Sequence, residues 1–454
     1  MAAPPDFDDV VRALADEPAL IVSLISQALP DDDYLPWRIL RHERPLPTIR
    51  LNESTEQTPR QLTPEQWWIS LRSGRRFRQK ELLGLTMPNG HPFTFVLTDR
   101  ILRDCDRTAA ALKGELGLGD EVTNSASRDR YIIHSLEDEA ITSSQLEGAM
   151  TTRQVAKRML RDDRAPRTHS EQMILNNYRA MRHIGQVRSQ KLTPQLVCEI
   201  HRIVTQNTLE DPDDAGRLQT NTDDRVGIYA VEDDALLHQP PPADQSPQRL
   251  DALCAFANGE DEGPYLPGVL RALVVHFMMG YNHFFADGNG RTARALFYWT
   301  MLHEGYWLAE YIAISMILNK ARVQYAESFL DVETDEGDLT YFFHYHLTVL
   351  SRAITNLESY IQRTTKELDA VRRRLDPATG EFNLRQIALL NAGYKDPDTT
   401  WTAQSAAAQF AVTINTAHTD LDDLVKRGWL ERARQGRKYV WRPTNRITEL
   451  APGS

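Results

Sequence analysis

The sequence has few cysteines and lacks any long apolar run. Cys105, Cys198 and Cys254 are scattered and odd in number, which fits a reducing cytosol better than a disulfide framework. No apolar stretch is long enough to span a bilayer, and the acidic segment 1–9 lacks the basic and apolar regions of a signal peptide. We therefore expect a cytoplasmic protein.

Internal repeats and low-complexity tracts are missing as well, which argues against a solenoid or a disordered chain. The 454 residues are 41% hydrophobic and 25% charged, as in an ordinary soluble globular protein. This length suffices for about three domains. The net charge of −11 opposes nonspecific attraction to DNA except where basic residues cluster locally.

The most informative segment is 283–294, His-Phe-Phe-Ala-Asp-Gly-Asn-Gly-Arg-Thr-Ala-Arg. Apolar helical patterns over 269–281 and 292–302 flank it, so we expect a tight loop between two buried helices. Gly288 and Gly290 allow positive φ angles and a close approach to a ligand. The free N–H groups of the second helix would point at an anion in this loop.

The charged residues of the loop have the chemistry that a polyphosphate requires. Arg291 and Arg294 are three positions apart, so their guanidinium groups share a helix face and can hold separate phosphates. Asp287 offers the hard oxygen that Mg²⁺ prefers, and His283 can act as a general base. The alternative is a Gly-Asn-Gly turn between two core helices with solvated arginines.

This segment resembles the signature of Fic-domain proteins, His-Pro-Phe-x-(Asp/Glu)-Gly-Asn-Gly-Arg-x-x-Arg. It matches every defined position except one, because Phe284 replaces the proline that would fix φ after the histidine. Fic enzymes typically transfer AMP from ATP to a protein hydroxyl and release pyrophosphate. A related branch with lysine in place of the second glycine is a phosphotransferase, and Gly290 argues against that branch.

The resemblance implies a role for each loop residue. His283 would deprotonate the attacking Ser, Thr or Tyr hydroxyl, Asp287 would hold Mg²⁺ between the α- and β-phosphates, and Arg294 would hold the γ-phosphate. The remaining residues that would surround ATP in this loop are Gly288, Asn289, Gly290, Arg291, Thr292 and Ala293.

A second informative segment, 136–148, has acidic residues before a helical pattern that ends at Gly148. Ser143 and Glu147 should lie one turn apart at the end of this helix. On its own this is an ordinary helix. It also resembles the Fic inhibitory motif, (Ser/Thr)-x-x-x-Glu-(Gly/Asn), of the subclass whose inhibitory helix precedes the catalytic core. Glu147 would then form a salt bridge with Arg294 and occupy the space of the γ-phosphate.

Weaker similarities concern ligand contacts around the core. The segment 224–229, which includes Val226 and Gly227, resembles the Fic flap that docks a target chain as an added strand. Tyr325 lies where the family often has an adenosine-contacting tyrosine, although a structural tyrosine fits equally. His201 and His276 have apolar helical surroundings typical of core histidines, and we expect no zinc site.

The expected fold class is mainly α, with a Fic-type helical core and a β-hairpin flap. The predicted domains are an α/β N-terminal accessory domain over 1–120, with Trp37, Trp67 and Trp68 as core residues, and a Fic domain over 121–350. The Fic domain would include the inhibitory helix at about 130–148. A linker helix over 351–375 and a winged helix-turn-helix over 376–454 would follow.

The C-terminal prediction rests on three helical segments and a hairpin, in that order. The helices are expected at 382–392, 402–410 and 415–427, and the hairpin strands at 429–431 and 438–441. The expected DNA-facing residues are Thr413, Asn415, Thr416 and His418 in the recognition helix and Arg432, Arg434, Arg437 and Lys438 in the wing. Protein–protein docking is the alternative, because Asp420, Asp422 and Asp423 would repel phosphate.

We predict an autoinhibited protein adenylyltransferase that uses ATP and Mg²⁺ and modifies a hydroxyl of a target protein or of itself. One alternative is a DNA-binding regulator whose Fic core senses nucleotides. Another is an enzyme that uses Glu147 to remove AMP from a modified protein. The resemblance is also compatible with a homodimer.

Overall fold

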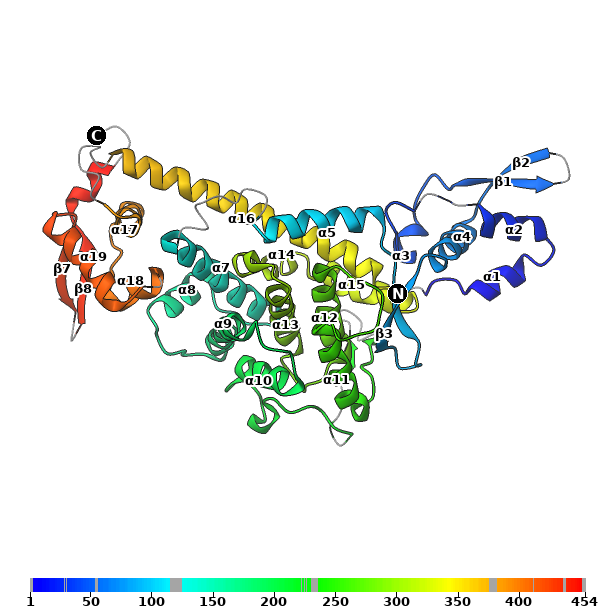
Figure 1. Ribbon diagram of the computed structural model, residues 1–454, viewed down its shortest axis with the longest axis horizontal. Coiled ribbons are helices and arrows are strands. Elements are labelled where there is room, and N and C mark those ends of the chain that lie inside the picture. The colour runs from blue at the N-terminus through cyan, green and yellow to red at the C-terminus, as the bar shows by residue number, and fades with distance from the viewer. Residues whose placement is uncertain are drawn as a thin grey trace.

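A computed structural model describes residues 3–27, 29, 31–53, 56–114, 125–221, 223, 225, 227–229, 236–374, 382–410, 412–435 and 438–450. The fold is mainly α, as predicted, with small two-stranded antiparallel sheets (Figure 1). Within the described residues, no helix combines the length and the apolar character needed to cross a membrane.

The first part of the chain forms two small cores of its own, built around Leu20, Ile49 and Trp68. Helix α4 starts with a capping box between Thr63 and Gln66, and its buried face includes Trp68. The elements are α1 Phe7–Ala13, α2 Pro18–Ser26, α3 Trp37–Leu40, β1 Thr48–Glu53, β2 Glu56–Gln61 and α4 Pro64–Arg76.

The next elements belong to the main core of the protein. These are β3 Lys80–Thr86, β4 Pro92–Phe95 and α5 Asp99–Leu112. Leu82, Phe93, Ile101 and Leu112 are buried in the same cluster as the helices around residues 268–303. The unit expected over 1–120 is therefore divided, because its last strands and helix share the main core instead of closing a separate one.

The main core is built around two central, almost fully buried helices, α12 Gly268–Asn282 and α13 Asn289–His303. A two-stranded flap, β5 Ile228–Tyr229 and β6 Leu236–His238, precedes them. The other elements are α7 Ser125–Leu146, α8 Arg153–Arg161, α9 His169–Val187, α10 Pro194–Thr205, η1 Pro212–Asp214, η2 Ala243–Gln245, α11 Ser246–Ala257, η3 Trp307–Tyr311, α14 Ser315–Leu318 and α15 Arg322–Thr334.

Helix α16, Thr340–Arg374, runs without interruption from the central helices to the C-terminal domain (Figure 1). The linker helix expected over 351–375 is thus the second part of a longer helix. Apolar residues such as Phe342 and Leu350 bury the first part of α16 in the main core, so its amphipathic second part continues a helix that has already begun.

The C-terminal domain has a core of its own around Leu390, Leu421 and Trp441. Its elements are α17 Leu384–Lys395, α18 Ala403–Phe410, α19 Ile414–Lys426, β7 Leu430–Gln435, β8 Lys438–Pro443 and η5 Asn445–Leu450. Three helices are followed by an antiparallel hairpin, the order of a winged helix-turn-helix. Helix α18 packs on α7 and α8, and α17 also contacts α7.

Candidate active site

The loop between α12 and α13 is closed by its own side chains. His283 ends α12 in the left-handed conformation, with φ 49°, and Gly288 precedes α13 with φ 81°. The Asn289 side chain accepts a hydrogen bond from the Phe285 amide at 3.0 Å and donates one to the Phe285 carbonyl at 2.7 Å. This two-way bond holds the loop as a tight bend.

His201 supports the loop from α10. Its Nδ1 accepts the Gly216 N–H at 2.9 Å, so Nε2 carries the proton and donates to the Asp287 carbonyl at 2.8 Å. The ring stacks on Phe285 with centroids 3.7 Å apart, and burial lowers the pKa of His201 to about 4. His201 is therefore a neutral core histidine that also positions the loop, a role that its apolar sequence surroundings did not suggest.

Only glycine fits at position 288. A Cβ there would lie 2.5 Å from Thr205 Cγ2 and 3.2 Å from His201 Nε2. Because Gly288 has no side chain, α13 begins without a side-chain cap. The first N–H groups of α13 therefore have no acceptor within the helix and face the loop, as in a typical anion site.

Arg291 lies beneath this helix start and is 1% exposed. Its Nη1 donates to the Val204 carbonyl at 3.1 Å, while its buried Nε has no hydrogen-bond partner among the described residues. Burial lowers the pKa of Arg291, and Asp287 opposes this effect. A buried guanidinium with a spare donor suits a phosphate oxygen and excludes the solvated arginines of the alternative reading.

Asp287 is the exposed carboxylate of the loop, with 62% of its side chain accessible. One oxygen accepts the Gly288 N–H at 2.5 Å, and the other lies 3.5 Å from Arg291 Nη2. Among the described residues, no group of three His, Cys, Asp or Glu side chains could hold a metal ion. A single carboxylate fits Mg²⁺ only when the substrate phosphates supply further ligands, which is the usual arrangement for this ion.

His283 is half-buried beside a cavity of about 200 Å³. Gly290, Glu147, Tyr281 and Phe329 also line this cavity. Burial lowers the pKa of His283, although the Gly280 backbone and Glu147 partly counteract it. A lowered pKa keeps the imidazole neutral, the form that can accept a proton at neutral pH.

Glu147 and Ser143 both contact Arg294, which is 1% exposed. Arg294 donates from Nη2 to Glu147 Oε1 at 2.8 Å and to the Ser143 carbonyl at 3.0 Å. Its Nε donates to Ser143 Oγ at 2.7 Å. Burial acts against the charge of Arg294, but Glu147 beside it raises the pKa of Arg294 above its usual value.

Gly290 is in close contact with the same carboxylate. A Cβ at position 290 would lie 2.2 Å from Glu147 Oε1. Glu147 therefore lies directly over the first turn of α13, where the helix N–H groups would meet an anion.

Glu139 fixes helix α7, which leads to Glu147, against the core. This fully buried carboxylate accepts hydrogen bonds from the Ser315 amide at 3.0 Å and the Tyr298 hydroxyl at 2.9 Å, and also from the Ser315 hydroxyl. Burial raises the pKa of Glu139. Sequence reasoning missed this residue because its partners lie more than 150 positions away.

The flap lies next to the loop. Gly227 has no room for a side chain, since a Cβ would lie 2.5 Å from Leu236 Cδ1, and Val226 lies outside the described residues. Arg225 donates to the Asn282 carbonyl at 2.5 Å. His238 of β6 lines the cavity, with Nδ1 2.8 Å from Glu333 Oε2. The flap thus provides a wall of the His283 cavity.

Tyr325 is partly buried and packs against the main core. Its hydroxyl is 2.8 Å from His276 Nε2, and burial raises the pKa of Tyr325 to about 12. His276 is fully buried among aromatic rings, including Phe297 and Phe342. Tyr325 therefore packs beside His276, and its role as an adenosine contact stays a prediction.

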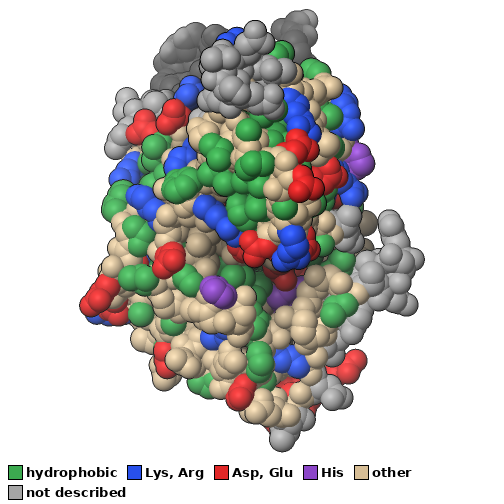
Figure 2. Space-filling model, turned by 90° about the vertical axis from the view of Figure 1, so that its right-hand side faces the viewer, with side chains coloured by type: hydrophobic (Ala, Val, Ile, Leu, Met, Phe, Trp, Pro, Cys, Tyr) green, Lys and Arg blue, Asp and Glu red, His purple; other side chains and the backbone are tan. Residues whose placement is uncertain are grey.

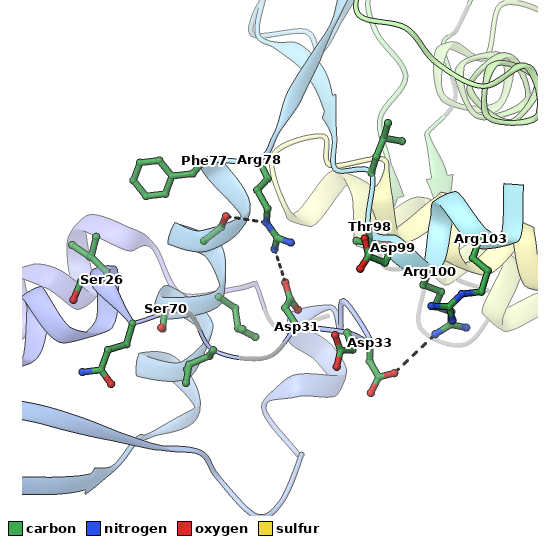
Figure 3. Close-up of a pocket in the computed structure, with 17 residues that line it drawn as sticks. Ser26, Asp31, Asp33, Ser70, Phe77, Arg78, Thr98, Asp99, Arg100 and Arg103 are labelled. Atoms are coloured by element: carbon green, nitrogen blue, oxygen red, sulfur yellow. Dashed lines mark hydrogen bonds and ion pairs between the residues drawn. The ribbon is translucent and has the colours of Figure 1, made fainter. Parts of the chain in front are cut away.

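A larger groove, of about 950 Å³, lies between the N-terminal helices and α5 (Figure 3). Its walls carry both charges, including Asp33 and Arg100, and the Asp31 carboxylate is already bound at 2.8 Å by the buried Arg75. The face at this end of the molecule is a mixture of acidic, basic and apolar side chains (Figure 2). The His283 cavity is much smaller, yet it contains the candidate base and the N-terminus of α13. We therefore take the His283 cavity as the candidate active site because of the groups that line it, although the other groove is larger.

Comparison with known proteins finds a family match in the central part of the chain. Residues 191–301 match the model of the Fic/DOC family. The chain is 27% identical over 212 residues to the protein adenylyltransferase Fic of Drosophila willistoni, and 26% identical over 213 residues to that of Drosophila mojavensis. Each alignment covers 46% of this chain and 39% of the relative, so the chain spans about two fifths of these relatives.

Solved structures with a similar arrangement include a Fic family protein from Desulfovibrio desulfuricans. It has a TM-score of 0.48 at 18% identity, covering 77% of this chain and 97% of that one. Fic-1 from C. elegans has a TM-score of 0.46 at 19% identity, covering 66% and 78% of the two chains.

Proposed function

Residues 191–301 form a Fic/DOC domain, and from this premise we propose that the protein transfers AMP from ATP to a hydroxyl group of a protein. The observation that carries the proposal is the meeting of a half-buried histidine and an uncapped helix N-terminus at one loop. The acceptor is a Ser, Thr or Tyr side chain of a target protein or of the enzyme itself.

His283 accepts the proton of the attacking hydroxyl. The hydroxyl oxygen then forms a bond to the α-phosphorus of ATP, and the bond from that phosphorus to the bridging oxygen breaks. Pyrophosphate leaves with this electron pair, and the proton remains on the imidazole until solvent removes it. Burial supports this role, because it lowers the pKa of His283 and keeps the base unprotonated at neutral pH.

The start of α13 neutralises and orients the phosphates. The N–H groups of residues 289–291, at the start of α13, and the spare Nε donor of Arg291 face the region where phosphate oxygens would lie. Arg294 binds the terminal phosphate once it is free of Glu147. Such positioning with charge neutralisation is the main requirement of phosphoryl-type transfer.

Asp287 is the residue that would hold Mg²⁺. When bound, the ion neutralises phosphate charge and links the phosphates to this carboxylate. The exposed side chain of Asp287 is compatible with that contact.

Glu147 inhibits the enzyme by competing with the terminal phosphate for Arg294. The carboxylate is 2.8 Å from Arg294 Nη2 and lies over Gly290. It therefore occupies the position of the terminal phosphate and is already paired with the arginine that would bind that phosphate. ATP then binds without its γ-phosphate on Arg294 and is poorly oriented for attack. Separating a carboxylate from a buried arginine leaves a buried charge unpaired, which makes displacement costly.

Mass spectrometry of Glu147→Gly after incubation with ATP and Mg²⁺ tests this function. We expect an added AMP on the variant itself or on a lysate protein, little addition by the wild type, and none by Glu147→Gly/His283→Ala. Absence of any adduct from Glu147→Gly, with the fold intact by circular dichroism, would overturn the proposal.

A second candidate function is removal of AMP from a modified protein. One observation favours it: Glu147 lines the same cavity as His283, and only its Oε1 bonds to Arg294 among the described contacts. The other oxygen could orient a water molecule toward an AMP ester. Release of free AMP from a modified substrate by the wild type, but not by Glu147→Gly, would support this reading over simple inhibition.

A further inference from the structure

The acidic residues of α19 are bound within the C-terminal domain. Asp420 accepts hydrogen bonds from Arg385 at 2.6 Å and from Asn383 at 2.7 Å. Asp423 accepts from Arg427 and from Gln386, both at 2.8 Å. These carboxylates tie α19 to α17 and to the end of α19 itself, so their charges are largely compensated.

The third acid of this helix, Asp422, ties α19 to the hairpin. It accepts the indole N–H of Trp441 at 3.0 Å and lies 3.4 Å from His418 Nδ1 and 3.7 Å from Arg432 Nη1. The repulsion of phosphate expected from Asp420, Asp422 and Asp423 is therefore offset by partners that the sequence pattern could not reveal.

The first turns of α19 present uncharged groups to solvent. Ile414 is 57% exposed, and Asn415 and Thr419 are exposed as well. Thr413 caps the helix by accepting the Thr416 N–H at 3.2 Å, so the backbone of this end is well defined. In a helix-turn-helix, side chains at this end of the second helix contact base edges in the major groove.

The hairpin places cations beside this helix. Arg432 is opposite Trp441 and Arg434 is opposite Tyr439, so all four lie on one face of the hairpin, and Trp441 attaches that face to α19. Lys426 and Arg434 are exposed and make no ion pair with any described residue. Residues 382–454 contain ten Lys or Arg against seven Asp or Glu, whereas the whole chain has a net charge of −11.

The hairpin lies at the far end of the molecule from the N-terminal helices (Figure 1). Helices α17 and α18 of this domain contact α7, and α18 also contacts α8, whereas Ile414 and Asn415 at the start of α19 are exposed. A basic surface beside an exposed recognition helix is thus present in a chain that is otherwise acidic.

We propose that this surface, formed by the first turns of α19 and the Arg432–Arg434 face of the hairpin, binds double-stranded DNA. Asn415 and Ile414 contact base edges in the major groove, where an amide can pair with adenine and an apolar side chain can touch a thymine methyl group. Arg434 contacts phosphates and sets the orientation. This activity goes beyond AMP transfer and does not depend on it.

Fluorescence anisotropy of the full-length His283→Ala protein with a pool of random duplexes at low salt tests the proposal independently of catalysis. Binding should weaken as salt increases, because phosphate contacts release counterions. Arg434→Ala should weaken binding to all duplexes about fivefold and reduce the salt slope by about one. Arg442→Ala is the matched control, since Arg442 pairs with Glu431 on the opposite face of the same hairpin and should change affinity less than about twofold.

Selection of bound duplexes from the pool then tests base contacts. Asn415→Ala should lose the sequence preference of the parent protein while retaining salt-dependent binding. Absence of duplex binding at low salt, or equal losses for Arg434→Ala and Arg442→Ala, would overturn the proposal. Self-association that Asn415→Ala abolishes, measured by light scattering and without DNA binding, would assign the surface to protein docking instead.

Discussion

Ser143 and Arg294 are joined by two hydrogen bonds, from Arg294 Nε to the serine hydroxyl at 2.7 Å and from Nη2 to the serine carbonyl at 3.0 Å. Ser143 thereby aims the guanidinium so that its remaining N–H groups meet Glu147. The inhibitory contact is consequently a three-residue arrangement and more than a single ion pair.

Ser143→Ala should partly release the enzyme. Removal of an acceptor that serves a buried charged donor costs about 1.5–3 kcal/mol, so we expect AMP labelling to increase about tenfold, less than for Glu147→Gly. Ser144→Ala is the matched control, because Ser144 is equally buried on α7 but donates to the Ala140 carbonyl at 2.8 Å. Equal labelling by the two variants would show that Ser143 does not orient Arg294.

Gly290→Ala should destabilise the wild type through Glu147. The new methyl group would lie 2.2 Å from Glu147 Oε1, and overpacking of this kind costs about 1–3 kcal/mol. In Glu147→Gly the clash is absent, and alanine should be neutral or slightly stabilising within the helix. The four proteins to compare are the wild type, Gly290→Ala, Glu147→Gly and the double variant. Their thermal unfolding measures how much Gly290→Ala destabilises the protein with and without the Glu147 side chain. An identical loss in both backgrounds would place the strain elsewhere.

His201→Phe should reduce turnover by about 10- to 100-fold in the Glu147→Gly background. Phenylalanine keeps the stack on Phe285 but leaves the Gly216 N–H and the Asp287 carbonyl without their partner, so the loop shifts. Steady-state kinetics well below the unfolding temperature check this, with a larger effect on kcat than on the KM for ATP. A change confined to unfolding temperature would make His201 purely structural.

The pH dependence of transfer should show an acid limb below the usual histidine range. The base must be neutral to accept a proton, and burial lowers the pKa of His283 from an unperturbed value of about 6.5. Lowering the pH to about 6.5 should therefore leave most of the rate of Glu147→Gly intact. A rate that halves above this pH would contradict the assignment of His283 as the base.

Acid should destabilise the protein below about pH 6.5. Burial lowers the pKa of His134, His201 and His344 to about 4 and that of His346 to about 3. The unfolded chain then binds more protons than the folded one, so stability is fully present above about pH 6.5 and falls as the pH approaches 4. Unfolding temperatures between about pH 7.5 and pH 5 should fall by several degrees.

Single substitutions separate this effect from general acid sensitivity. His346→Phe should reduce the dependence of the unfolding temperature on pH, because it removes one buried histidine that binds a proton only in the unfolded chain. His91→Phe should leave the slope unchanged, since His91 is exposed. An unchanged slope in both variants would place the acid sensitivity in other groups.

Local sequence patterns were sufficient to predict those features that depend on contacts between residues close together in the sequence. The loop is closed by Asn289 and Phe285, four positions apart, and its bend requires Gly288, so a short motif predicts it. The apolar patterns around it gave helices α12 and α13 within a few residues. The hairpin and the three helices of the C-terminal domain were likewise found at nearly their predicted positions.

Contacts between distant segments could not be read from the sequence. Glu139 meets Ser315 across 176 positions, and Arg385 meets Asp420 across 35, so neither partner has a local signal. The division within residues 1–120 was missed for a related reason: Phe93 and Ile101 belong to a core most of whose members lie beyond residue 130. Which segments share a core depends on how the whole chain folds, and a local sequence pattern cannot reveal it.

Helix α7 touches the C-terminal domain at one end and leads to Glu147 at the other. Beside this junction, His134 and Glu137 of α7 line a cavity together with Ala408 and Gln409 of α18. Helix α7 has 22 residues and is therefore about 33 Å long. Helix α7 therefore extends from the contact with the C-terminal domain to the ion pair between Glu147 and Arg294.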